Sequence, residues 1–102
     1  MYDFQETDQY ADWFNGITDE RAKDRINARI HSTKNGNFGV CESVGEGVVE
    51  MKLRYGPGYR IYYCPCGKDA FVLLTGGTKR RQQGDIDRAK SIKRELERGG
   101  AW

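Results

Sequence analysis

Seven side chains in the second half of the chain have the types needed to hold and cleave an RNA phosphodiester. Six are cations and one is a tyrosine: Lys52, Arg54, Arg60, Tyr62, Lys79, Arg80 and Arg81. Cations that gather on one surface bind phosphate and stabilise the charge that develops on a pentavalent phosphorane. These residues therefore predict an RNA-binding face.

Cleavage of RNA also needs a base for the 2′-hydroxyl and assistance for the leaving 5′-oxygen. The chain has 1 histidine, His31, which falls on an expected helix surface, and we leave it out of the site. No cluster of carboxylates has the spacing of a two-metal site. The residues thus predict cleavage without a metal or cofactor, with lysine and arginine in place of histidine.

The charge is unevenly distributed along the chain. Residues 1–51 hold five Lys or Arg against ten Asp or Glu, and residues 52–102 hold twelve against five. The second half is therefore the anion-binding half. The alternative is that these cations lie at a sheet edge and discourage aggregation. That role explains one or two of the six.

Three cysteines, Cys41, Cys64 and Cys66, form an odd set, and the first residues lack the apolar segment of a signal peptide. These features predict free thiols and a cytoplasmic protein. A zinc site at Cys64 and Cys66 would need two further ligands, so we interpret Cys64-Pro65-Cys66-Gly67 as a turn. No run approaches the roughly 20 apolar residues of a membrane span.

Hydrophobic periodicity and turn residues predict the elements that position the cations. One helix should begin at Thr7 or Asp8, and the next at Thr18 or Asp19. A segment without regular structure should follow, because it contains Gly39, Gly45 and Gly47. Gly76-Gly77 should end the last strand. The expected strands are Met1 to Gln5, Val48 to Tyr55, Tyr59 to Cys64 and Ala70 to Thr75, and the last helix runs from about Gly84 to Arg98.

Alternation within the second expected strand assigns its two faces. Val49, Met51, Leu53 and Tyr55 would face the helices, and Glu50, Lys52 and Arg54 would face solvent. The expected fold is α+β: one domain over residues 1–102, with an N-terminal strand and a helix hairpin packed on an antiparallel sheet, and a C-terminal helix.

Several segments together resemble one protein family over nearly the whole chain. They are Trp13-Phe14, Gly36-Asn37-Phe38-Gly39, Val44-Gly45-Glu46-Gly47-Val48, Leu53-Arg54-Tyr55-Gly56-Pro57-Gly58-Tyr59-Arg60-Ile61-Tyr62, Leu73-Leu74-Thr75-Gly76-Gly77-Thr78-Lys79 and Asp85-Ile86-Asp87-Arg88-Ala89. The family is the RelE and ParE superfamily of toxins, and within it the HigB-like and RelE-like phage-related killer proteins of addiction modules.

The resemblance implies the toxin of a bacterial type II toxin–antitoxin system, a cytoplasmic protein in complex with its cognate antitoxin. RelE-like members cleave messenger RNA in the ribosomal A site, which implies mRNA and the 70S ribosome as partners. Lys52, Arg60 and Arg80 are then the expected catalytic residues, and Arg54, Tyr62, Lys79 and Arg81 the expected RNA-binding residues.

This sequence departs from the RelE pattern at two places. Glu50 stands where a second lysine is frequent, and Asp85 and Ile86 occupy the region of a base-stacking tyrosine. Two alternatives on the same fold stay open: a ParE-like inhibitor of DNA gyrase that cuts nothing, and a member that only binds the antitoxin.

Overall fold

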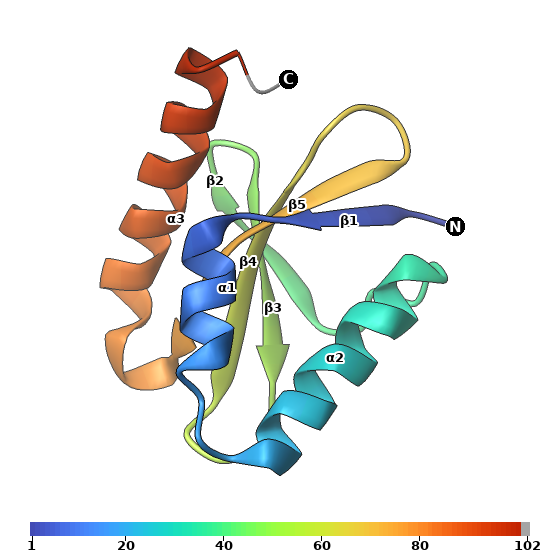
Figure 1. Ribbon diagram of the computed structural model, residues 1–102, viewed down its shortest axis with the longest axis vertical. Coiled ribbons are helices and arrows are strands. Elements are labelled where there is room, and N and C mark those ends of the chain that lie inside the picture. Colours follow the sequence, from blue (N-terminus) through green and yellow to red (C-terminus); the bar gives the residue numbers. More distant parts are fainter. Residues whose placement is uncertain (101–102) are drawn as a thin grey trace.

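A five-stranded mixed sheet, in the order β1-β5-β4-β3-β2, forms the centre of the protein (Figure 1). The computed structural model describes residues 1–100, so the last two residues of the expected domain lie outside it. The elements in chain order are β1 (Asp3–Glu6), α1 (Asp8–Asn15), α2 (Glu20–Lys34), β2 (Cys41–Gly45), β3 (Val48–Leu53), β4 (Tyr59–Pro65), β5 (Ala70–Thr78), a short 3₁₀ helix η1 (Lys79–Arg81) and α3 (Gln82–Arg98).

The α+β fold is as predicted, with one change in the sheet. Strands β2 to β5 form an antiparallel meander, but β1 pairs in parallel with β5, from Asp3 opposite Ala70 to Glu6 opposite Leu73. The expectation of a purely antiparallel sheet is therefore wrong at this edge. Parallel pairing is possible because the long connection from β1 to β5 contains the rest of the meander and both N-terminal helices.

The two N-terminal helices begin at side-chain caps. The Thr7 hydroxyl accepts a hydrogen bond from the backbone N–H of Tyr10, and the Asp19 carboxylate accepts from Arg21 and Ala22. Each cap satisfies backbone donors that the first helical turn leaves free. The prediction of Thr7 or Asp8 as the first cap is confirmed by Thr7, and that of Thr18 or Asp19 as the second is confirmed by Asp19.

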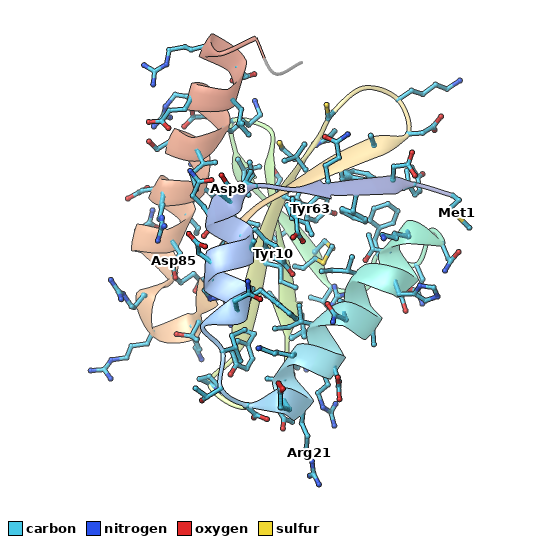
Figure 2. The ribbon with its side chains drawn as sticks, viewed as in Figure 1. Met1, Asp8, Tyr10, Arg21, Tyr63 and Asp85 are labelled. Carbon is cyan, nitrogen blue, oxygen red and sulfur yellow. The ribbon has the colours of Figure 1, made fainter. Side chains whose placement is uncertain are left out.

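Helices cover both faces of the sheet, and Figure 1 shows α2 and α3 on opposite sides of β3 and β4. The face under α1 and α2 buries the expected side chains of β3, Met51 and Leu53, against Ile26 and Ile30 of α2. Figure 2 shows Tyr10 of α1 on this side of the molecule. The opposite face packs Tyr62 and other side chains of β4 and β5 against α3.

The charged face of β3 is therefore not the solvent-facing surface that alternation predicts. The Glu50 and Tyr62 side chains are fully buried, and Arg60 is 9% exposed. Alternation identified two distinct faces correctly, but it could not show that α3 packs on the second one. Of the cations expected at the site, this covering helix leaves Lys52, Arg54 and Lys79 accessible at one end of the sheet.

The last strand continues through Gly76 and Gly77, which were expected to end it. A Cβ on Gly76 would lie 2.4 Å from the Trp13 ring, and one on Gly77 would lie 1.9 Å from the Asp85 carboxylate. These two glycines therefore do not end the strand. They allow α1 and α3 to approach it closely, because a larger residue at either position would collide with the helix above it.

Strand β2 occupies part of the stretch that was expected to be irregular. It pairs with β3, Cys41 opposite Met51 and Glu42 opposite Glu50. Its short polar sequence has little β-propensity of its own, so its conformation depends on pairing with a well-formed neighbour. The pairing brings Glu42 alongside the expected site.

Candidate nucleic-acid interface

Lys52 and Arg60 lie directly opposite each other on β3 and β4. The preceding pair on the same face is Glu50 and Tyr62, which lies beneath the beginning of α3. The Lys52 side chain is 31% exposed, whereas that of Glu50 is wholly buried. The sheet thus emerges from under α3 at the Lys52–Arg60 pair.

A groove of about 350 Å³ opens at this end of the sheet. Four cations line it together with two apolar side chains and a glycine: Lys52, Arg54, Arg60, Lys79, Val40, Leu53 and Gly58. We call it the cationic groove. No carboxylate is among these lining residues, so the positive potential within the groove is opposed only by acids outside its walls.

Gly58 shapes the wall of the cationic groove beside Arg60. Its carbonyl accepts hydrogen bonds from Nη1 of Arg60 at 2.8 Å and from the backbone N–H of Lys79 at 2.9 Å. Its φ is 79°, and a Cβ there would lie 2.9 Å from that guanidinium. Glycine is required for both reasons, because other residues rarely adopt this backbone conformation and would displace the arginine.

The Arg60 guanidinium lines the groove but is only partly satisfied by the protein. Its Nε is buried and has no hydrogen-bond partner among the described residues. An arginine that is 9% exposed would normally have its donors paired. The Gly58 carbonyl nonetheless holds the Arg60 guanidinium in place at the wall of the groove.

A buried carboxylate anchors α3 next to the cationic groove. The Tyr62 hydroxyl donates to Glu50 Oε2 at 2.9 Å, and the Gln82 amide donates to the same oxygen at 2.9 Å and to Oε1 at 3.2 Å. Gln82 is the first residue of α3. The carboxylate therefore connects β3, β4 and the start of the helix.

Lys52 lies between two carboxylates of different exposure. Its Nζ is 3.0 Å from Oε2 of Glu42, whose side chain is 63% exposed, and 3.8 Å from Oε1 of the buried Glu50. The exposed pair contributes little to stability and exchanges readily with solvent ions. The outer ion pair of Lys52 is therefore open to solvent, whereas its inner one belongs to the buried network.

The structure places the other expected residues in three different environments. Arg54 and Lys79 are exposed and line the cationic groove, and Arg80 and Arg81 are exposed on η1 without lining it. Tyr62 is buried beneath α3, which corrects its expected position on a solvent-facing surface. RNA would reach this tyrosine only if the helix moved.

Burial changes the ionisation of two groups near the start of α3. The pKa of Tyr62 is raised well above its usual value of 10.0, mainly because the hydroxyl is buried and, to a smaller extent, because it donates to Glu50. Tyr62 therefore remains a neutral hydrogen-bond donor. Desolvation also raises the pKa of Asp85 from 3.8, although Arg81 and Arg88 oppose the shift. Figure 2 shows Asp85 on the lower half of α3.

Sequence analysis missed three contributors to this region. Arg29 of α2 donates to the carbonyls of Lys52, at 2.7 Å, and of Phe38 and Val40, each at 2.8 Å, and so fixes the apolar wall of the cationic groove. The other two, Glu42 and Gln82, are partners of Lys52 and Glu50. Nothing in their local sequence indicated these roles, because all three contacts join separate elements.

The three cysteines are free in this structure. Among residues 1–100, no group of three or more His, Cys, Asp or Glu side chains could hold a metal ion. Desolvation raises the pKa of the Cys64 thiol to about 11. Burial therefore keeps the Cys64 thiol protonated near neutral pH.

The fold and the groove define an α+β protein whose mixed sheet is covered on both faces and presents cations at one end. No model of a known protein family matches the sequence. An uncharacterized protein of Haemophilus influenzae is 39% identical over 87 residues, which make up 85% of this chain and 88% of that protein. This chain belongs to the same family as the Haemophilus protein. No helix within the described part is long and apolar enough to cross a membrane.

Proposed function

We propose that this protein is the toxin of a bacterial type II toxin–antitoxin pair, a metal-independent endoribonuclease that cleaves messenger RNA on the ribosome. The observation that carries the proposal is the cationic groove, which four Lys or Arg side chains line without any carboxylate. The resemblance of nearly the whole sequence to RelE and ParE toxins supports the toxin class. The α+β architecture with a C-terminal helix is compatible with it.

The phosphate of the scissile bond would lie between Lys52 and Arg60. A guanidinium and an ammonium on adjacent strands approach one phosphate from two sides, and each makes charge-assisted hydrogen bonds. Since Arg60 is already held by the Gly58 carbonyl, little side-chain entropy would be lost on binding. Both cations would interact most strongly with the extra charge of the phosphorane.

In the proposed reaction the 2′-oxygen attacks phosphorus while the bond from phosphorus to the 5′-oxygen breaks. The 2′-hydroxyl loses its proton, the departing 5′-oxygen gains one, and the products are a 2′,3′-cyclic phosphate and a 5′-hydroxyl. No histidine lines the groove within residues 1–100, so proton transfer lacks the usual group. Cleavage would depend strongly on exact alignment of the RNA, which an ordered partner such as the ribosome supplies.

The proposed antitoxin would neutralise the toxin by covering the same charge. An acidic segment seated on the cationic groove would relieve repulsion among its cations and exclude RNA. Segments that fold on binding cover large surfaces and are easily degraded when free. A toxin–antitoxin hetero-oligomer is therefore the expected resting state.

Controlled expression followed by mapping of transcript 5′ ends tests this function. Wild type should arrest growth and produce new 5′ ends within codons, whereas Lys52→Ala should reduce cleavage by about a hundredfold. Lys68→Ala is the control, because Lys68 is an exposed lysine in the turn between β4 and β5 and does not line the groove. It should behave like wild type.

A ParE-like activity would give a different result in the same cells. DNA gyrase would be trapped on broken DNA, and transcript ends would remain unchanged. Arrest with trapped breaks and intact messages would overturn the ribonuclease proposal, and an absence of arrest with normal expression would overturn the toxin proposal.

A further inference from the structure

A second groove, of about 400 Å³, adjoins the cationic groove on the side of α2. The two share four lining residues, Val40, Lys52, Leu53 and Arg54. The second groove adds Arg25, Ala28, Arg29 and Tyr55 to these walls. The concave surface is therefore continuous from η1, across the end of β3, to α2, and neither part has a carboxylate in its lining.

Arg25 and Tyr55 form a flat, charged surface in the second groove. The Arg25 guanidinium lies 4.5 Å from the centre of the Tyr55 ring. The Tyr55 hydroxyl donates a hydrogen bond to Asp19 Oδ2 at 3.3 Å, and this contact helps to fix the position of the ring. Arg25 is exposed and makes no ion pair with any described residue.

Arginine planes and aromatic rings are the groups on which unpaired bases stack in single-stranded RNA sites. Arg29, one turn further along α2, is occupied by backbone carbonyls and shapes the wall instead. Arg25 and Arg54 are thus the cations of the second groove that are free to meet a ligand. A planar surface beside two free cations suits a nucleotide better than the side chains of an acidic peptide.

We propose that the second groove is a nucleotide subsite, in which Arg25, Arg54 and Tyr55 hold the single-stranded RNA segment adjacent to the phosphate at Lys52 and Arg60. The inference rests on the proposed function and specifies its substrate as an extended single strand rather than a duplex. A short RNA fills only the cationic groove. A longer one also contacts the Arg25–Tyr55 surface.

Binding of 2′-O-methyl oligoribonucleotides, which cannot be cleaved, tests the subsite by fluorescence anisotropy. Arg25→Gln should weaken binding of a nine-nucleotide strand about tenfold, the size of effect that loss of one stacking contact produces. It should also reduce the slope of log affinity against log salt by about 0.7 if one phosphate contact is lost. Binding of a three-nucleotide strand should be unchanged.

Arg21→Gln is the matched control on the same helix. Arg21 is also exposed, lines neither groove, and projects from the start of α2 away from the sheet (Figure 2). Both variants change one exposed arginine, so both should melt within a degree or two of wild type. The control should bind the nine-nucleotide strand as wild type does.

The outcomes separate this inference from the proposed function. If wild type binds the nine-nucleotide strand, Lys79→Ala weakens it and Arg25→Gln equals Arg21→Gln, the subsite is wrong and the cationic groove stands. If wild type binds neither strand, the RNA function itself fails. Tighter, Arg25-dependent binding of single-stranded DNA or of a glutamate-rich peptide would overturn the assignment to RNA.

Discussion

Replacing Glu50 with alanine should be among the most destabilising single changes in the protein. The substitution removes a fully buried carboxylate that accepts from Tyr62 and Gln82. It leaves the Tyr62 hydroxyl buried without a partner and Lys52 without its inner counter-ion. Leaving the buried Tyr62 hydroxyl without its acceptor costs about 1–3 kcal/mol, which is a large share of the roughly 5–15 kcal/mol that stabilises a typical domain.

Two comparison variants separate the network from simple loss of volume. Glu50→Met combined with Tyr62→Phe removes both buried polar groups and fills the space with apolar atoms, so it should recover at least half of the loss. Glu42→Ala removes the exposed partner of Lys52 and should cost less than about 1 kcal/mol. The double variant therefore tests the polar network, and Glu42→Ala tests the ion pair alone.

Urea unfolding followed by circular dichroism measures these differences. The midpoint should fall for Glu50→Ala while the m-value stays the same, since the surface exposed on unfolding hardly changes. A loss below about 1 kcal/mol for Glu50→Ala would refute the reasoning, as would a double variant less stable than Glu50→Ala. Either result would mean that the carboxylate does not anchor α3.

Three further predictions concern packing and ionisation. Gly76→Ala should lower the free energy of unfolding, measured in urea, by about 1–3 kcal/mol, because the added Cβ meets the Trp13 ring. Gly84→Ala should raise it by up to about 1 kcal/mol, because Gly84 lies in α3 with open space around it. Equal effects of the two substitutions would contradict the packing argument. The pKa of Asp85 in the folded protein lies above 3.8, so protonated Asp85 favours folding at low pH, and this stabilisation is lost as the pH rises through the folded pKa. The free energy of unfolding of Asp85→Asn, relative to that of wild type, should therefore increase from about pH 3 to pH 6. A flat difference would show that Asp85 titrates normally. Cys64, buried with its pKa near 11, should resist iodoacetamide until the protein unfolds, as mass spectrometry would show, and rapid labelling of the native protein would be the contrary result.

Local patterns in the sequence were sufficient to predict most elements. Period-2 alternation located β3, and the caps Thr7 and Asp19 located the first two helices. The position of α3 was also predictable, but the surface it covers was not. Helix periodicity identifies an apolar side, whereas only the packed structure shows which face of the sheet receives it.

Local patterns also predicted part of the candidate site, but not the contacts that depend on how α3 packs. Strand alternation placed Lys52 and Arg60 on the same face of two neighbouring strands, and the structure shows that they lie opposite each other. The burial of Tyr62 and the partners of Glu50 depend on α3, which is distant in sequence. Arg25 carried no local signal, because its neighbour Tyr55 lies on a separate element.

Cleavage of a defined message by purified protein on programmed ribosomes tests the central claim most directly. Message positioned in the A site should acquire a new 5′ end in the presence of a chelator, and Lys52→Ala should slow its appearance about a hundredfold while Lys68→Ala leaves it unchanged. The fragment upstream should carry a 2′,3′-cyclic phosphate. Message that stays intact with folded wild-type protein, or cleavage that is indifferent to Lys52, would contradict the account.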